Sequence, residues 1–166
     1  MFSELSRELL PIYLNDHLAG ASVGCELARR AAQQNAGTEL GDYLDFFAAD
    51  AEAHRAQLED VMARLDVKRD QFKLGAGWLA EKLGRLKLNG RLLEYSPLSR
   101  VIELEGLTLG AHGRLQLWRT LAAAAPDEPR IAEIDFVHLI EDTERQIEAL
   151  EQHHLSAVQT MLAAAT

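Results

Sequence analysis

Histidine and carboxylate side chains one helical turn apart are the groups in this sequence that could bind a metal ion. Asp50 and His54 are four residues apart in a strongly helical stretch, so they lie on one face and could share an ion. A site for two ions inside a four-helix bundle needs more ligands: a Glu from each of two helices and a Glu-x-x-His from each of the others. Ala51 stands where the Glu of that motif would precede His54.

A second segment repeats the pattern around His54 without its ligands. Residues 50–59 and 142–151 share Asp, Glu, Leu and Glu at matching offsets, as two duplicated helical hairpins would. In the second copy, Thr143 and Gln146 stand at the ligand positions. We therefore expect no intact di-metal site and no cofactor. If a reduced ligand set binds metal, iron or manganese is expected, and the candidates are His17, Asp50, His54 and Glu103, supported by Asp16 and Glu105.

Four predicted helices must position these side chains. Ala, Leu, Glu and Arg dominate the sequence and β-branched residues are scarce, which favours helix throughout. Pro11 suits the first turn of the first helix, Gly37 its end, and Thr38 the cap of the second. Ser96 precedes the third helix and Pro129 the fourth. The predicted helices span residues 10–34, 39–65, 98–125 and 130–163.

Residues 66–97 form a long connection between the second and third helices. Neighbouring helices usually need only about 2–8 residues, whereas this stretch can travel the length of a bundle. We predict a short helix over 78–88 within it, and we interpret its basic residues as a solvated face rather than an anion site. The sequence thus predicts one all-α domain, residues 1–166. Its architecture is a four-helix bundle with one long crossover, which is the ferritin-like arrangement.

A helical wheel separates polar residues that face the core from those that face water. We place Asn15, Glu105 and Asp142 on the wet faces. Cys25 lies on an apolar face, where we interpret it as inert packing rather than a nucleophile. Each inward histidine is interpreted first as a hydrogen-bonded core residue. The inward polar set is His17, His54, Glu103, Arg114, Thr143 and His154.

Glycines are unusually frequent inside two of the predicted helices. Each costs about 1 kcal/mol relative to Ala in a helix, so the set needs a reason. One reason is close approach of the two helix backbones; the other is a cavity for a small apolar ligand. We expect close packing. The glycines are Gly20 and Gly24 in the first helix and Gly106, Gly110 and Gly113 in the third.

Composition excludes several functional classes. The formal net charge is −9, which disfavours nucleic-acid binding because phosphates need a basic face. No apolar run approaches the ~18 residues of a membrane span, and no basic segment precedes an apolar core as in a signal peptide. Cys25 is the single cysteine and suits a reducing compartment. We therefore expect a cytoplasmic protein with neither nucleic acid nor membrane as partner.

The sequence resembles the ferritin-like superfamily and, within it, the bacterial stress-protein family typified by YciF. The similarity is concentrated in residues 49–62, where an acidic helix leads into Leu-Glu-Asp-Val. Residues 14–16 (Leu-Asn-Asp) and 113–115 (Gly-Arg-Leu) are similar to steps in that family's first and third helices. The resemblance implies a small, soluble, dimeric helical bundle of poorly defined role. The family's Glu ligands would fall near Ala21 and Thr108, so the resemblance implies the fold more than the chemistry.

Three functions remain open from the sequence. The first is a ferritin-like bundle without an intact di-metal site, acting as a binding or structural protein, with stress response as one setting. The second is a metal-binding oxidase or iron-binding protein with a reduced ligand set. The third is a bundle that binds a small apolar ligand near the glycines. Leu9, Tyr13 and Leu27 lie outside the main apolar stripe, so we also expect a homodimer that buries such faces.

Overall fold

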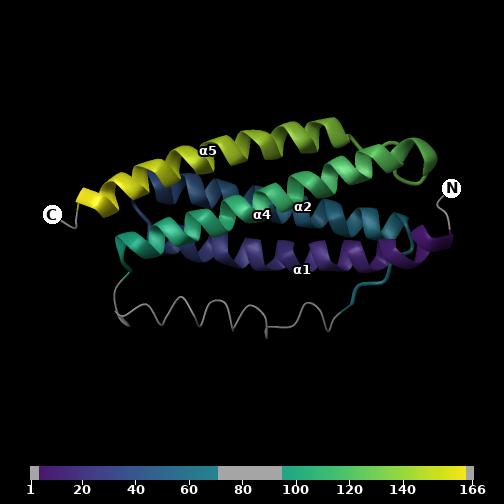
Figure 1. Cartoon of the computed structure of the whole chain (residues 1–166), viewed down its shortest axis with the longest axis horizontal. Helices are drawn as coiled ribbons and strands as arrows, with labels where there is room; N and C mark the ends of the chain where they lie inside the picture. The colour runs from purple at the N-terminus through teal and green to yellow at the C-terminus, as the bar shows by residue number, and fades with distance from the viewer. Residues whose placement is uncertain (1–3, 71–94, 164–166) are drawn as a thin grey trace.

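The computed structural model describes residues 4–70 and 95–163, and within these ranges the chain is helical with no strand. The long helices are α1 (Glu4–Gln34), α2 (Glu39–Arg64), α4 (Pro97–Ala124) and α5 (Phe136–Ala163). A short 3-10 helix, η1 (Ala125–Asp127), comes directly after α4. The all-α prediction is confirmed, and the described helices form an elongated bundle (Figure 1). The predicted helix over 78–88 and most of the long connection lie outside the described residues.

Local capping signals explain where α2 and α4 begin. Thr38 accepts a hydrogen bond from the Gly41 amide at 3.1 Å, and Ser96 accepts one from the Ser99 amide at 3.1 Å. Gly37 has a φ of 78°, the left-handed conformation expected after the end of α1. A Cβ at Gly41 would lie 2.2 Å from the backbone oxygen of Asn35. The sequence therefore has glycine at position 41 because the preceding turn passes too closely for any side chain.

Two predicted helix starts are wrong. The first helix begins at Glu4 and continues through Pro11, because a proline removes one backbone hydrogen bond without forcing an end to the helix. The fourth begins at Phe136 rather than at residue 130. The carboxylate of Asp135 accepts the His138 amide at 2.9 Å, so Asp135 caps this helix. Residues 128–135 instead form turns anchored by Ile131, which is fully buried.

The helices are arranged as two antiparallel pairs, α1 with α2 and α4 with α5, joined through α4 and α1 (Figure 1). The chain leaves α2 beside the start of α1, where Asn15 binds the Lys68 carbonyl at 3.0 Å and the Asp70 amide at 2.7 Å. It re-enters beside the end of α1, where Asn35 donates to the Tyr95 hydroxyl at 2.8 Å. These two places are about 30 Å apart along α1. The chain ends that flank residues 71–94 therefore lie far apart along the bundle, one beside the N-terminal half of α1 and the other beside its C-terminal end.

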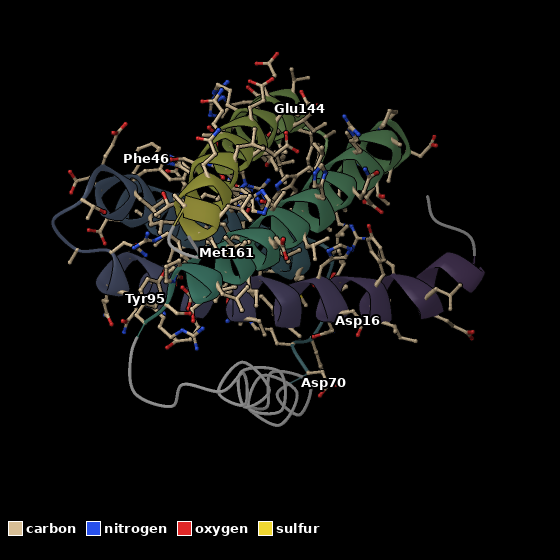
Figure 2. All side chains as sticks on the ribbon, turned by 60° about the vertical axis from the view of Figure 1, so that its left-hand side comes forward. Asp16, Phe46, Asp70, Tyr95, Glu144 and Met161 are labelled. Carbon is tan, nitrogen blue, oxygen red and sulfur yellow. The ribbon has the colours of Figure 1, made fainter. Side chains whose placement is uncertain are left out.

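Two groups of buried apolar side chains form the core. One is centred on Leu44, Leu104 and Leu150, and the other contains Leu14 and the fully buried Trp118. Asn15 is also buried, although the sequence predicts that it faces water. Its side-chain amide forms hydrogen bonds with the backbone of the segment that follows α2, and this segment covers it. Helix α4 lies between α1 and α5 in a second view, so it contributes to both sides of the core (Figure 2).

Candidate functional site

A cavity of about 300 Å³ lies between α1, α2 and α4, where the two core groups meet. Its walls are mainly apolar and include Cys25 from α1, Phe47 and Leu58 from α2, and Leu107 and Trp118 from α4. Helix α5 contributes none of the lining side chains. A concave, mostly apolar cavity with a few polar groups is the usual form of a small-molecule site.

Glycines on facing helices create this space. Tyr13 donates a hydrogen bond to Thr120 at 3.2 Å, and Leu27 lies beside Gly106. Both pairs fit one antiparallel alignment of α1 with α4, because the two residue numbers in each pair have the same sum. In that register Gly20 lies opposite Gly113, and Gly24 lies one residue from the position opposite Gly110; all four line the cavity. A Cβ built at any of these four would meet no atom within 4 Å.

The expectation of close backbone packing is therefore wrong for these four glycines. Only Gly106 fits it, since a Cβ there would lie 3.1 Å from Leu27 Cδ2. The spacing of α1 and α4 is set by larger side chains on either side of the glycines, such as Tyr13 and the Arg30–Glu103 pair. Because those contacts hold the backbones apart, the missing side chains leave space instead of allowing approach.

Arg114 is the cation held deepest in the wall of the cavity. One terminal nitrogen, Nη2, donates to Gln146 Oε1, and the guanidinium lies over the Phe47 ring at 5.7 Å from its centre. Its Nε atom is buried and has no hydrogen-bond partner among the described residues. An unmatched buried donor costs about 1–3 kcal/mol. Burial lowers the pKa of Arg114, although Asp142 and Asp50 oppose that effect.

His54 is a hydrogen-bonded core histidine, as predicted. The Trp118 indole donates to its Nδ1 at 3.1 Å, so Nε2 carries the proton that bonds Asp142 at 2.9 Å. Burial, together with the nearby charge of Arg114, lowers the pKa of His54 to about 4. At neutral pH both ring nitrogens are therefore occupied by the protein, in a single neutral tautomer.

Asp142 and Gln146, on one face of α5, link His54 to Arg114. The helical wheel places Asp142 on the wet side, yet it bonds both His54 and the Gln146 amide, the latter at 3.0 Å. The same amide also donates to Asp50 at 3.0 Å. Burial raises the pKa of Asp50, and the charge of Asp142 adds to this effect. The spacing of Asp142 and Gln146, four residues apart, is the sequence signal for this network.

The six candidate metal ligands do not converge. Glu103 is buried at the far end of the α1–α4 contact, where Arg30 holds it at 2.7 Å and Tyr95 donates to it at 3.0 Å. Asp16 is exposed on α1 (Figure 2). Glu105 is also exposed and pairs with His154 at 3.2 Å, outside the core. Only Asp50 and His54 belong to one network, and there they bond Gln146 and Asp142 rather than each other.

These residues do not fit the pair of ions that ferritin-like bundles hold. His54 has no free nitrogen, and the carboxylate of Glu103 is neutralised by Arg30. Within residues 4–70 and 95–163, no group of three or more His, Cys, Asp or Glu side chains could hold a metal ion.

The remaining predicted inward residues have different surroundings. His17 is half-buried and lines the cavity, and burial lowers its pKa. Its ring packs edge-on against that of Tyr13, with 4.5 Å between the ring centres. Thr143 is fully buried and bonds the Leu139 carbonyl, as its inward placement predicts. His154 lies at the surface edge instead of the core, because it pairs with exposed Glu105. Phe47 and Trp118 are buried, as their place on apolar helix faces predicts, but the sequence does not indicate that they form cavity walls.

Cys25 is buried in the cavity wall and stays a thiol near neutral pH. Burial, reinforced by the charge of Glu52, raises its pKa to about 11. A nucleophilic cysteine requires the opposite shift, so the site offers no activated nucleophile here. His54 also has both ring nitrogens hydrogen-bonded, so neither Cys25 nor His54 is an activated group in this cavity.

Comparison of the chain with family models, curated proteins and solved structures finds no match. Among the described residues, no helix is long and apolar enough to span a membrane.

Proposed function

We propose that the protein is a binding protein for a small, largely apolar molecule, held in the cavity between α1, α2 and α4. The observation that carries this proposal is the set of four facing glycines. Each weakens its helix by about 1 kcal/mol, and none is compensated by a packing contact. What they provide is volume in a mostly apolar wall.

The cavity volume limits the size of the ligand. A cavity of about 150 Å³ holds benzene, so about 300 Å³ has room for roughly twelve non-hydrogen atoms. Gly20 and Gly110 are solvent-exposed at the edge of this space, and we place the entrance between them. The ligand would thus enter between α1 and α4 and stack near Phe47 and Trp118.

The bundle is further proposed to be ferritin-like, with residues 66–97 as the long crossover and the di-metal site lost. In support, the two flanking chain ends lie about 30 Å apart along α1. Ala51 and Thr143 provide no ligands, and Gln146 bonds carboxylates instead of a metal. Elemental analysis of protein purified without added metal tests this. We expect much less than one ion per chain. A stoichiometric metal that is lost in His54→Ala would overturn the proposal.

A homodimer is also proposed, through faces that a four-helix core leaves uncovered. Of the residues used for this prediction, Leu9 is exposed, whereas Tyr13 and Leu27 are half-buried against α4. Better candidates are exposed leucines on α4 and α5: Leu98, Leu109, Leu155 and Leu162.

Binding of a neutral probe tests the proposed function. We choose 3-phenylpropan-1-ol, which has an aromatic ring and fits the size limit, and measure its binding by isothermal titration calorimetry. One molecule should bind per chain, with a Kd on the order of 0.1–1 mM for so small a ligand. Gly24→Leu fills the cavity and Gly110→Leu blocks its entrance, so each should abolish binding. Ala53→Leu adds the same side chain at an exposed position of α2 and should leave it unchanged. Absence of binding to the unmodified protein would refute the proposal.

A further inference from the structure

Two arginines line the cavity, and they differ in their partners. Arg55 forms an ion pair with Glu52 at 2.9 Å, so its charge is neutralised at the surface. Arg114 has no carboxylate within ion-pair distance among the described residues. Its hydrogen bond goes to the neutral amide side chain of Gln146. Of the two lining arginines, Arg114 is therefore the one that the described part of the chain leaves without a direct counter-ion.

Gln146 keeps the nearest carboxylates away from Arg114. Its Oε1 accepts from the guanidinium, while its Nε2 donates to Asp50 and Asp142, both at 3.0 Å. Neither aspartate lines the cavity. The Gln146 amide thus bridges the guanidinium to the two carboxylates, Asp50 of α2 and Asp142 of α5, and of these four side chains only Arg114 lines the cavity. A guanidinium has five N–H donors, and here one is used by Gln146.

Apart from half-buried His17 on the α1 wall, the other polar groups of the cavity are already hydrogen-bonded or lie at its edge. His54 uses both ring nitrogens, one of them for the indole of the cavity wall. Asp16 is exposed at the outer edge on α1. His17 beside it packs against Tyr13, whose hydroxyl donates to α4. A ligand with a hydrogen-bond acceptor would therefore find its partner inside the cavity in Arg114, and the glycine walls would surround its apolar part.

We propose that the ligand is a small monocarboxylate with an apolar body, whose carboxylate accepts hydrogen bonds from Arg114. This inference rests on the proposed function, since it assigns the ligand class of the same cavity. The guanidinium is planar and pairs with a carboxylate in a fork geometry, which a neutral oxygen matches only in part. The Phe47 ring beneath the guanidinium adds a cation–π contact, with 5.7 Å between the guanidinium carbon and the ring centre. The apolar body would extend towards Gly20 and Gly110.

Three probes of one shape separate this inference from the proposed function. They are 3-phenylpropanoate, 3-phenylpropan-1-ol and 3-phenylpropylamine, titrated by calorimetry at pH 7. The carboxylate should bind about tenfold or more tightly than the alcohol, because a charge-assisted hydrogen bond replaces a weaker one. The amine should bind most weakly. If the alcohol or the amine binds as tightly as the carboxylate, the carboxylate inference is wrong and the cavity proposal stands. If the alcohol does not bind, the cavity proposal itself fails.

Arg114→Met tests the assigned partner. Methionine keeps much of the side-chain length but has no charge or donor. The variant should lose about tenfold or more in affinity for the carboxylate and change its affinity for the alcohol by no more than about twofold. Retained alcohol binding shows that the cavity is still folded. Arg55→Met is the matched control at the other lining arginine, and it should leave the preference for the carboxylate intact. An Arg114→Met protein that still prefers the carboxylate would overturn the assignment.

Discussion

Alanine substitution of the four cavity glycines should stabilise the protein while it weakens ligand binding. Gly20, Gly24, Gly110 and Gly113 lie inside helices, and a Cβ at each meets no atom within 4 Å. Each change removes a helix penalty of about 0.5–1 kcal/mol at no steric cost. Summed over four sites, the free energy of unfolding should rise by about 2–4 kcal/mol. For a chain of this size the Tm should then rise by roughly 5–15 °C.

Urea unfolding followed by far-UV circular dichroism measures this effect. The quadruple variant should have a higher midpoint with an unchanged slope, since only stability is altered. Gly41→Ala is the contrasting control. Its Cβ would lie 2.2 Å from a backbone oxygen, and it should destabilise the protein by about 1–3 kcal/mol. In the quadruple variant the four new methyl groups occupy part of the cavity, so 3-phenylpropan-1-ol should bind more weakly. A quadruple variant that is less stable than the unmodified protein would show that the two helices touch at these glycines.

Three further measurements test the histidine network, the cavity wall and the dimer. The pKa of His54 is about 4 in the folded protein and about 6.5 in the unfolded chain. Its contribution to the free energy of unfolding is therefore complete above pH 6.5 and is lost as the pH falls towards 4. We expect the free energy of unfolding, measured with urea, to fall between about pH 7 and pH 4.5 in both proteins. The fall should be about 2–3 kcal/mol smaller in His54→Gln than in the unmodified protein, and equal falls would refute this. Cys25 should react slowly with iodoacetamide at pH 8, and more slowly with 3-phenylpropan-1-ol bound, as measured by mass spectrometry; unchanged labelling would place the probe elsewhere. Light scattering should show a dimer that Leu109→Glu with Leu155→Glu converts to a monomer; a monomeric unmodified protein would contradict the proposed homodimer.

Local signals predict the parts of the fold that local chemistry determines. Thr38 and Ser96 cap helices as expected, since a cap depends on a few adjacent residues. The start of α5 is not predicted correctly, because Pro129 resembles a helix boundary whereas Asp135 provides the cap. Pro11 resembles a helix start because proline is common in a first turn and rare in a helix interior, where α1 in fact places it.

The sequence predicts several residues of the candidate site correctly but not what those residues do there. The sequence singles out His54, Arg114 and the glycines, but it predicts that the glycines bring helices together. Whether a glycine closes a gap or opens one depends on the helix separation, which distant contacts such as Arg30–Glu103 decide. A helical wheel places Asp142 in water because it does not include the neighbouring helix, and here that neighbour presents His54. Tertiary partners therefore limit the prediction of the site.

Trp118 gives the cavity an optical reporter of its own. Its indole is fully buried, forms part of the cavity wall and donates a hydrogen bond to His54. Indole emission depends on the polarity around the ring, so replacing the contents of the cavity should shift the fluorescence of Trp118. In a Trp78→Phe background this is the single tryptophan of the chain. Occupancy could then be monitored in real time, on unlabelled protein, for any compound that does not itself absorb at the excitation wavelength.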